Sequence, residues 1–572
     1  MIDRLTVLVS DPDARVIEAE TGTWVVSGVR TGALESLIRR AESVAAVRRR
    51  VGSATEDAAL VHVSDDRRTV RAYRTVVGSR RLYFLRGSDG GAVVTDHFRT
   101  ALARLDAGDR TVPRSALADH LLFRAPIPPS TFVSEIGCVP QGEWLTWDLD
   151  ADERALTAVD RLSPGPPLRP KAAIDRLDGL LADALRFDDD RPASNLYSGG
   201  VDSTLVQSYL GDSVPMLNVG IDSPEYAFEV EYAREGGARF DAEFRQEILD
   251  EREVLERLES SVDALGSPAF PLMTPLIDAA FARGNDRRYM MAINADTLCG
   301  DAGTKGARVA SWLAPVLLSP LGALAGRTAP SGIGSRIRRL RSIARRQRYD
   351  PSDPRSFPQQ FVAYTKPALV ADVLGEDVVK ARCRAQVRHV RDRLDFAPAG
   401  SRFERQIEAA HLLSMYAHRI GCRWRQLAAS HGNALETPFE TRSVAECVLS
   451  VPASRRYVEG PPRARRLRTK HLLKRLLARR LPSYPTTQPK GAGVLPFERY
   501  FEEGALTGVF DRYDVPEFVP DELREAAIED SGRQAWNLVT YAVWRDRVLR
   551  DPALEPAPSP IRLEWRAAPR VS

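Results

Sequence analysis

The chain has 572 residues, which is enough to bury more than one hydrophobic core, because single cores stop growing near about 250–300 residues. Its hydrophobic fraction of 43% and charged fraction of 28% are ordinary for a soluble globular protein. The formal net charge of +4 argues neither for nor against a nucleic-acid partner, so composition predicts two or three domains and names no partner.

The five cysteines exclude two classes of small, cross-linked protein. They are scattered, odd in number and never spaced as CxxC, which fits neither a disulfide scaffold nor a zinc site. We expect buried free thiols in a reducing cytoplasm. The first residues lack the apolar core of a signal peptide, and the most apolar stretch, 312–325, is interrupted by Pro315 and Pro320. We therefore expect a cytoplasmic protein without a membrane span.

Residues 1–160 contain short alternating runs that predict strands, at 23–27, 59–63, 81–85 and 142–147. We expect residues 161–174 to be a linker, because the Pro-rich segment 163–170 within it cannot hold a helix or a central strand.

Residues 175–550 have a different pattern, in which strands alternate with helices. Strands are predicted at 194–197, 215–221 and 288–294, with an apolar helix around 205–210, and the chain becomes mostly helical from about 355. This alternation predicts a parallel, doubly wound sheet.

Two further segments look like accessories. Residues 335–346 form a basic amphipathic pattern, whose functional interpretation is attachment to a membrane surface or an acidic partner. We favour the plainer interpretation, a solvated helix face in a loop insertion. The tail at 551–572 is Pro-rich, and we expect it to be poorly ordered.

The most informative residues are 198–203, Ser-Gly-Gly-Val-Asp-Ser, between a predicted strand and a predicted helix. Two glycines allow a tight turn, and the following amides at a helix N-terminus favour an anion. Asp202 would repel a phosphate by itself, but it suits a Mg²⁺ ion that bridges to phosphate oxygens. The alternative is a Ser/Gly turn with an N-capping Asp. A Walker A loop is not present, because 300–305 has the wrong spacing.

These six residues resemble the pyrophosphate loop of the N-type ATP pyrophosphatases, and the chain is similar to one family that carries it, the asparagine synthetases. Ala-Asp-Thr-Leu-Cys-Gly at 295–300 resembles the family's second motif, and 490–501 resembles its C-terminal Lys-x-Gly-Phe-x-x-Pro stretch. Thr-Pro-Phe at 437–439 and the run that starts at Thr469-Lys470 resemble two segments between them. The resemblance covers nearly the whole chain, with the motifs in family order.

The resemblance implies a set of site residues. Asp202 and Asp296 would hold Mg²⁺, and Lys490 would stabilise charge that develops at the transferred centre. The alternatives are an N-capping role for Asp296 and a solvated surface position for Lys490. The residues expected to contact ATP are Ser198, Gly199, Gly200, Asp202, Ser203 and Val219.

The sequence departs from the family at the start of the chain. The family's amidotransferase domain begins with a catalytic cysteine after the initiator Met, whereas Ile2 stands here. An alkyl side chain cannot form the thioester that glutamine hydrolysis requires. Segments at 95–102 and 140–147 still resemble that domain, so we interpret it as a structural remnant.

Three further departures affect the second half. The glycine-rich loop before Asp296 is replaced by residues 292–294, Ala-Ile-Asn, and Thr297 replaces a Glu. The family's carboxylate before Val-Pro-Phe falls at Ala434, with Glu436 the nearest alternative as a base for the amine.

The sequence thus predicts an α/β fold: a remnant of an Ntn-hydrolase-like αββα sandwich at 1–160, then a doubly wound ATP-pyrophosphatase domain at 175–550 with a helical C-terminal part. The implied reaction is adenylation of a carboxylate by Mg·ATP and amide formation with release of AMP and pyrophosphate, without glutamine hydrolysis. β-Lactam synthetases and lasso-peptide macrolactam cyclases share that loss.

Two alternatives remain open, an ammonia-dependent asparagine synthetase and a nucleotide-binding pseudoenzyme that serves as a scaffold. The implied partners are a small amino acid or peptide carboxylate and an amine, and a homodimer is left open. No concentrated basic groove is evident, so we expect no nucleic acid.

Overall fold

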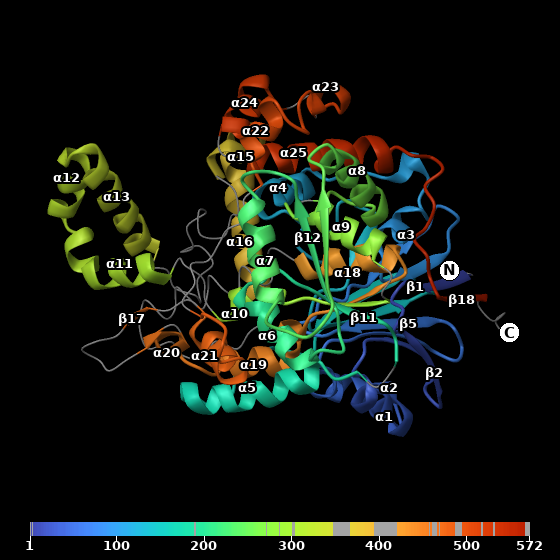
Figure 1. Ribbon diagram of the computed structural model, residues 1–572. Coiled ribbons are helices and arrows are strands. Elements are labelled where there is room, and N and C mark those ends of the chain that lie inside the picture. The colour runs from blue at the N-terminus through green and yellow to red at the C-terminus, as the bar shows by residue number, and fades with distance from the viewer. Residues whose placement is uncertain are drawn as a thin grey trace.

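The computed structural model describes residues 2, 4–187, 190–269, 271–284, 287–299, 304–346, 367–393, 420–456, 458–459, 466–467, 470–486, 495–515, 519–529 and 532–566. Within them the protein is α/β, with two stacked sheets in the N-terminal part and one parallel sheet in the second part (Figure 1). Cys138, Cys299, Cys383, Cys422 and Cys447 are buried free thiols, as the sequence predicts.

The first sheet of the N-terminal part has the strand from the start of the chain as a buried inner strand. In sheet order its strands are β18 (Ile561–Arg566), β1 (Arg4–Val9), β7 (Ala92–Thr95), β6 (Tyr83–Arg86) and β8 (Ile136–Cys138). The partner sheet is antiparallel, with the order β10 (Glu153–Ala158), β9 (Glu143–Asp148), β5 (Thr69–Arg74), β4 (Ala59–Val63), β3 (Gly22–Ser27) and β2 (Arg15–Ala19). An apolar core that includes Val7, Val61 and Trp147 fills the space between the sheets.

Helices cover the outer faces of both sheets. α1 (Gly32–Arg40), α2 (Val44–Arg50) and the 3₁₀ turn η1 (Val51–Ala54) share a second core with the antiparallel sheet. α3 (Phe98–Leu102), the 3₁₀ turn η2 (Ala107–Asp109) and α4 (Arg114–Phe123) lie on the side of the first sheet. α3 and α4 join that sheet to the core of the second part, so the N-terminal layers run α, β, β, α.

The predicted strands correspond closely to β3, β4, β6 and β9, but the prediction of a poorly ordered tail is wrong, and the expected linker ends earlier than predicted. The expected linker contains the start of α5 (Pro170–Ala184), because Pro170 occupies the first turn, where no N–H donor is needed. The tail is ordered over 551–566, and its last six described residues pair with β1 as strand β18. The sequence Ile-Arg-Leu-Glu-Trp-Arg alternates apolar and charged side chains along that strand.

The second part contains a wholly parallel sheet. Its order is β13 (Phe244–Leu249), β12 (Met216–Ile221), β11 (Ala193–Leu196), β14 (Arg288–Met290) and β15 (Ala434–Glu436). The chain builds outward from β11 to β13, then returns to the other side of β11 with β14 and β15. This reversal is the doubly wound topology that the sequence predicts, although β14 is shorter than the predicted run.

The connections between the parallel strands place helices on both faces of this sheet. On one face lie α6 (Val201–Leu210) and α7 (Ala227–Gly237), with α5 and α21 (His471–Arg480) packed beside them. On the other lie α8 (Glu253–Leu265), α9 (Thr274–Arg283) and α18 (Ile420–Ser430), which face the N-terminal part.

The remaining described elements surround this body. They are α10 (Ala295–Cys299), α15 (Pro367–Leu374), α16 (Glu376–Arg391), the 3₁₀ turn η4 (Pro438–Glu440), α19 (Arg442–Leu449), α20 (Ala453–Arg456), β16 (Val458–Glu459), β17 (Arg466–Leu467), α22 (Phe497–Glu502), α23 (Val509–Arg512), α24 (Asp521–Glu529), α25 (Arg533–Trp544) and the π-helical turn η5 (Arg545–Leu549). Three more, α11 (Thr304–Leu317), α12 (Pro320–Thr328) and α13 (Ser331–Arg346), form a lobe at the left of Figure 1.

Candidate functional site

The topology of the parallel sheet brings two predicted site segments to one place. β11 and β14 are neighbouring strands. From β11 the chain adds β12 and β13 on one side and later adds β14 and β15 on the other side, so the strand order reverses between β11 and β14. In doubly wound sheets, ligands bind beyond the carboxyl ends of the strands at this switch point. β11 leads into residues 198–203 and β14 leads into the turn before Asp296.

The loop after β11 is held in a tight conformation by its own side chains. The hydroxyls of Ser198 and Ser203 lie 3.1 Å apart, and the Ser203 hydroxyl also accepts the backbone N–H of Ser198 at 3.2 Å. Gly199 has φ +71°, and a Cβ there would lie 2.4 Å from the carbonyl oxygen of Tyr232. Glycine is therefore required at this position. Gly200 caps α6, whose N-terminus carries the partial positive charge of the helix.

The turn after β14 contains a residue in the left-handed conformation. Asn294 has φ +65°, a conformation that asparagine adopts more readily than most side chains. Its side-chain amide donates to Glu440 at 2.8 Å. The turn then opens directly into α10, which carries Asp296 in its first turn.

A lysine joins the two predicted metal-binding carboxylates. The Lys470 ammonium forms an ion pair with Asp202, and the Lys470 side chain is only 11% exposed. Burial by itself lowers the pKa of Lys470, but Asp202 and Asp296 outweigh burial and hold that pKa above its ordinary value. Burial, and next the charge of Asp202, raises the pKa of the Cys299 thiol on the same helix as Asp296. The structure thus brings Asp202, Asp296 and Lys470 together.

Lys470 was not among the predicted site residues, although it lies in the segment that resembles a family motif. The available signal was a basic residue directly before the apolar run of α21. Because α21 packs against α6 and α10, the helix carries Lys470 to the ends of both. Only the tertiary contact shows that this lysine faces the two carboxylates.

Lys490 lies outside the described residues, and its predicted role stays a prediction. The described residues on either side belong to the carboxyl edge of the sheet. The Tyr484 hydroxyl donates to the carbonyl oxygen of Gly199 at 2.7 Å. Arg499 forms ion pairs with Glu225 and Glu251, which follow β12 and β13.

Val219 lies on β12, the strand next to β11, and is half-buried against the core of the second part. Its neighbour Asn218 donates to the carbonyl oxygen of Tyr197, just before the loop, at 2.8 Å. β12 is thereby fixed beside the loop, but no contact tests the role predicted for Val219.

Glu436 lies at the carboxyl end of β15, but its carboxylate faces the N-terminal part. Arg80 Nη2 lies 2.9 Å from Glu436 Oε1, and Arg425 also contacts this oxygen. Burial by itself raises the pKa of Glu436, and Arg425 and Arg80 outweigh burial and lower it. A carboxylate held by two guanidinium groups is a poor proton acceptor.

Glu440, which the sequence analysis did not single out, lies closer to the Asp296 turn. It accepts from Asn294 and, at 2.7 Å, from the Thr437 hydroxyl. Burial raises the pKa of Glu440 above its ordinary value, although Arg425 opposes this. The raised pKa makes Glu440 the better proton acceptor of the two carboxyl groups.

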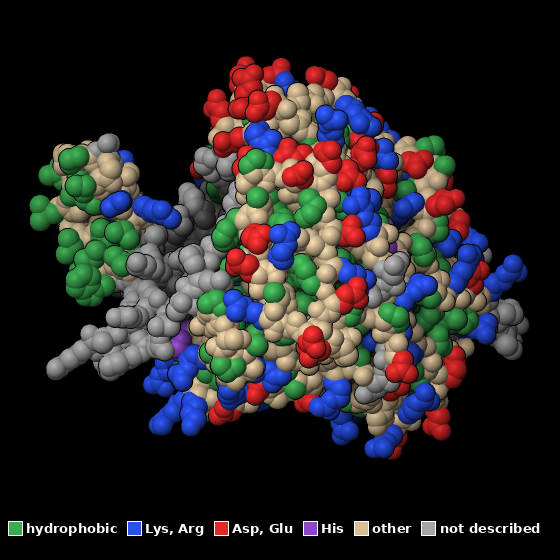
Figure 2. Space-filling model, in the orientation of Figure 1, with side chains coloured by type: hydrophobic (Ala, Val, Ile, Leu, Met, Phe, Trp, Pro, Cys, Tyr) green, Lys and Arg blue, Asp and Glu red, His purple; other side chains and the backbone are tan. Residues whose placement is uncertain are grey.

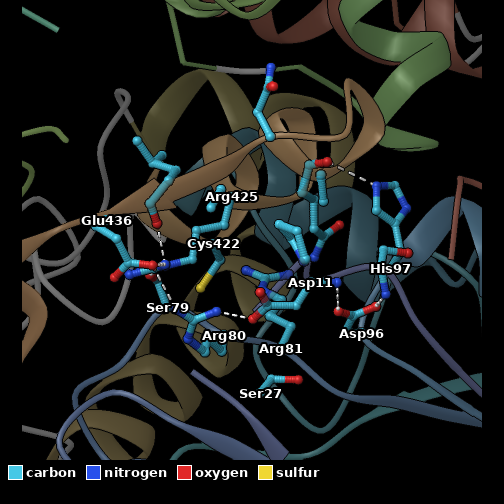
Figure 3. A pocket seen from close by; sticks show the side chains of 17 residues that line it. Asp11, Ser27, Ser79, Arg80, Arg81, Asp96, His97, Cys422, Arg425 and Glu436 are labelled. Carbon is cyan, nitrogen blue, oxygen red and sulfur yellow. Dashed lines mark hydrogen bonds and ion pairs between the residues drawn. The ribbon is translucent and has the colours of Figure 1, made fainter. Parts of the chain in front are cut away.

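A small cavity lies where the two parts of the molecule meet (Figure 3). Its lining includes Asp11, Arg80 and Asp96 from the N-terminal part and Arg425 and Glu436 from the second part. The cavity of about 40 Å³ has room for water or a small ion, but not for a nucleotide. Buried ion pairs among the residues that line the cavity join the two parts.

Ile2 takes part in the core between the two N-terminal sheets. Its side chain is 1% exposed, and its N–H donates to the carbonyl oxygen of Leu149 at 2.8 Å. Position 2, where the resemblance implies a nucleophilic cysteine, is thus an apolar packing position in this chain.

The donor set fits Mg²⁺ and a nucleotide polyphosphate. Mg²⁺ is usually held by one or two carboxylates together with substrate phosphates, and Asp202 and Asp296 provide two carboxylates. Over the described part of the chain, no group of three or more His, Cys, Asp and Glu residues is arranged to hold a metal by itself. The tight turn at Gly199 and the N-terminus of α6 are suited to phosphate oxygens.

Comparison with known families decides the relationship. The family model described as asparagine synthase matches residues 176–545. The chain belongs to the asparagine synthase family. The matched region, here called the asparagine synthase domain, contains β11 to β15 and the loop at 198–203. A comparison with curated proteins gave no match. Membership of this family implies that the protein is an ATP-dependent ligase that acts on a carboxylate and an amine.

No helix in the described ranges has the length and apolar character needed to cross a membrane.

Proposed function

We propose that the protein activates a carboxylate as its adenylate and transfers the acyl group to an amine without hydrolysing glutamine. The observation that carries the proposal is the meeting of Asp202, Asp296 and Lys470 at the switch point of the asparagine synthase domain. In the first step a carboxylate oxygen attacks the α-phosphorus of ATP, and pyrophosphate leaves. In the second step the amine attacks the acyl carbon, AMP leaves, and the amine gives up a proton.

The proposed roles follow from charge and position. Asp202 and Asp296 would hold Mg²⁺, which would supply positive charge to offset that of the phosphate oxygens. Ser198, Gly199, Gly200 and Ser203 receive the departing pyrophosphate, and Val219 lines the nucleotide position. Lys470 supplies a fixed positive charge next to the carboxylates, and Lys490 offsets charge at the transferred centre.

The loss of glutamine hydrolysis is supported by Ile2, whose side chain is buried in the inter-sheet core. The amine is then free ammonia or an amino group of the substrate. A carboxyl group accepts its proton, and Glu440 is better suited than Glu436 because its pKa is raised.

The test is ATP–pyrophosphate exchange with the full chain against a panel of carboxylates that includes aspartate and peptides. Exchange should depend on one acid and fall at least about a hundredfold in Asp202→Ala, since Mg²⁺ and its substrate phosphates lose a ligand. Asp183→Ala is the matched control, because Asp183 is 67% exposed and pairs only locally with Arg186. ATP binding without exchange for any acid would favour the scaffold, and aspartate with ammonium as the sole substrates would favour asparagine synthesis.

A second comparison assigns the proton acceptor. Glu440→Gln should slow amide formation while leaving ATP–pyrophosphate exchange near the wild-type rate, because the first step needs no base. If Glu436→Gln does so instead, the role belongs to Glu436.

A further inference from the structure

The lobe formed by α11, α12 and α13, here called the three-helix arm, has an unusual charge. Between residues 304 and 346 the sequence contains nine Lys and Arg and no Asp or Glu. The whole chain has a net charge of only +4, so the rest of the chain is net negative. Positive charge is therefore concentrated in the arm.

The arm also exposes large apolar side chains. Trp312 is 80% exposed, Leu321 is 76% exposed and Val316 is 64% exposed. Val309, Trp312 and Val316 recur at helical spacing on α11, as Leu321 and Leu324 do on α12, so each set shares one helix face. Figure 2 shows hydrophobic side chains spread over the lobe, with Lys and Arg beside them.

These exposed residues are not left over from poor packing of the arm. Ala310, Ala314, Leu317 and Ala344 form its own small core. Arg341 of α13 donates to the carbonyl oxygens of Leu317 and Ser319, between the end of α11 and the start of α12. Arg338 of α13 donates to the carbonyl oxygen of Gly326, near the end of α12. The three helices thus hold one another, and the apolar side chains outside this core face solvent.

We propose that the three-helix arm docks on the surface of an anionic lipid bilayer. A solvated helix face does not account for a tryptophan that is 80% exposed. Amphipathic helices with Trp and Leu on one side and arginines around them lie in the membrane interface, where the apolar residues enter the headgroup boundary and the cations attract anionic lipid. The arm lies on the membrane and does not cross it.

Two other occupants are less suited to this surface. A second copy that received the arm on its acidic body, in a reciprocal two-fold contact, would match the charge of the arm but not its exposed apolar side chains. An acidic polypeptide would match the charge but not the exposed Trp312, Leu321 and Val316. Both are outcomes of the test.

The test is flotation of the full chain with vesicles, at low and at high salt. Vesicles of equal phosphatidylglycerol and phosphatidylcholine should bind the protein at least about tenfold more tightly than phosphatidylcholine alone, and 0.5 M salt should weaken that binding. Trp312→Ser with Leu321→Ser, and separately Arg336→Glu with Arg339→Glu, should each weaken it at least about tenfold. Arg336 and Arg339 are exposed and outside the contacts that hold the arm together.

Control variants carry changes of the same kind elsewhere. Val16→Ser removes an apolar side chain that is 40% exposed, and Arg39→Glu with Arg40→Glu reverses two exposed charges on α1. These variants should bind vesicles like the wild type. The proposal is overturned by absence of binding at low salt, by equal effects of the controls, by binding to polyglutamate but not to vesicles, or by a dimer that the Trp312 variant loses. Equal melting temperatures exclude misfolding as the cause.

Discussion

At the scale of single residues, the site depends on backbone geometry as much as on charge. Gly199 is fixed in a left-handed conformation against the backbone of α7, and Lys470 is buried in an ion pair with Asp202, with the charge of Asp296 also raising its pKa. The glycine shapes the loop and the lysine balances its charge. Each role predicts a distinct response to substitution.

Gly199→Ala should weaken nucleotide binding and destabilise the fold. The left-handed φ costs about 1–2 kcal/mol for alanine, and the Cβ would overlap the carbonyl oxygen of Tyr232. Binding of a fluorescent ATP analogue should fall at least about tenfold, together with a lower urea midpoint. Gly179→Ala is the control: nothing lies within 4 Å of its Cβ, and alanine in the middle of α5 should stabilise by about 0.5–1 kcal/mol. Unchanged binding in Gly199→Ala would show that the loop does not form the nucleotide site.

Lys470→Gln should leave two carboxylates without their cation and lower the free energy of unfolding by about 3 kcal/mol. Mg²⁺ should recover part of this loss, because a divalent cation replaces the missing positive charge. Thermal melting with and without Mg²⁺ measures both effects, and Mg²⁺ should raise the melting temperature more in the variant than in the wild type. Arg475→Gln, at an exposed position of the same helix, should change neither. An unaltered melting temperature in Lys470→Gln would contradict the ion pair.

At the scale of elements, the last described strand joins the two ends of the chain. β18 pairs antiparallel with β1 along its whole length, and Ile561, Leu563 and Trp565 pack on the core between the N-terminal sheets. Arg110 also donates to three backbone carbonyl oxygens between residues 548 and 551. These contacts fix the segment that precedes β18 against the N-terminal part. The tail is therefore a structural element of the N-terminal part.

A chain that ends at Pro560 should be less stable by about 2–4 kcal/mol, since three half-buried apolar side chains and a row of backbone hydrogen bonds are lost. It should also aggregate more readily, because β1 becomes an unprotected edge. Urea unfolding and light scattering check the two effects. A chain that ends at Arg566 keeps β18 and should behave like the full chain; equal stability of the two truncations would show that the pairing adds nothing.

At the scale of the whole molecule, buried polar contacts join the N-terminal part to the asparagine synthase domain. Arg425 lies 2.6 Å from Asp57 and also contacts Glu436, while Arg80 binds Asp11 and Glu436. His97, at the start of α3, lies with Nε2 3.1 Å from the carbonyl oxygen of Gln426 and accepts the N–H of Arg99 through Nδ1. These contacts require a neutral His97.

The stability of the molecule should therefore fall in mild acid. Burial lowers the pKa of His97 from 6.5 to about 4, so its contribution is present above pH 6.5 and is lost as pH falls toward 4. Between pH 7 and pH 4.5 this one group should cost about 2–3 kcal/mol. His97→Gln should lose that much less stability over the same interval, measured by urea unfolding at both pH values, while the exposed control Asp183→Ala should follow the wild type. Parallel pH dependence of His97→Gln and the wild type would contradict the prediction.

Features that depend on local chemistry could be predicted from the sequence. Alternation and turn residues predicted β3, β4 and β9, the doubly wound order followed from strands that alternate with helices, and the Ser-Gly-Gly-Val-Asp-Ser loop indicated a phosphate site. The family match to 176–545 agrees with the resemblance read from those motifs. All of these signals lie within short stretches of the chain, where period and spacing are visible.

Only the tertiary structure decided which distant side chains meet. Lys470 reaches Asp202 because α21 packs on α6, and Glu436 turns away because Arg80 and Arg425 bind it from another part of the chain. The alternation in β18 was visible, but its partner β1 lies more than 550 residues away, so the Pro-rich composition favoured a loose tail. Such contacts depend on how helices and sheets pack, and that packing is not encoded in any single segment.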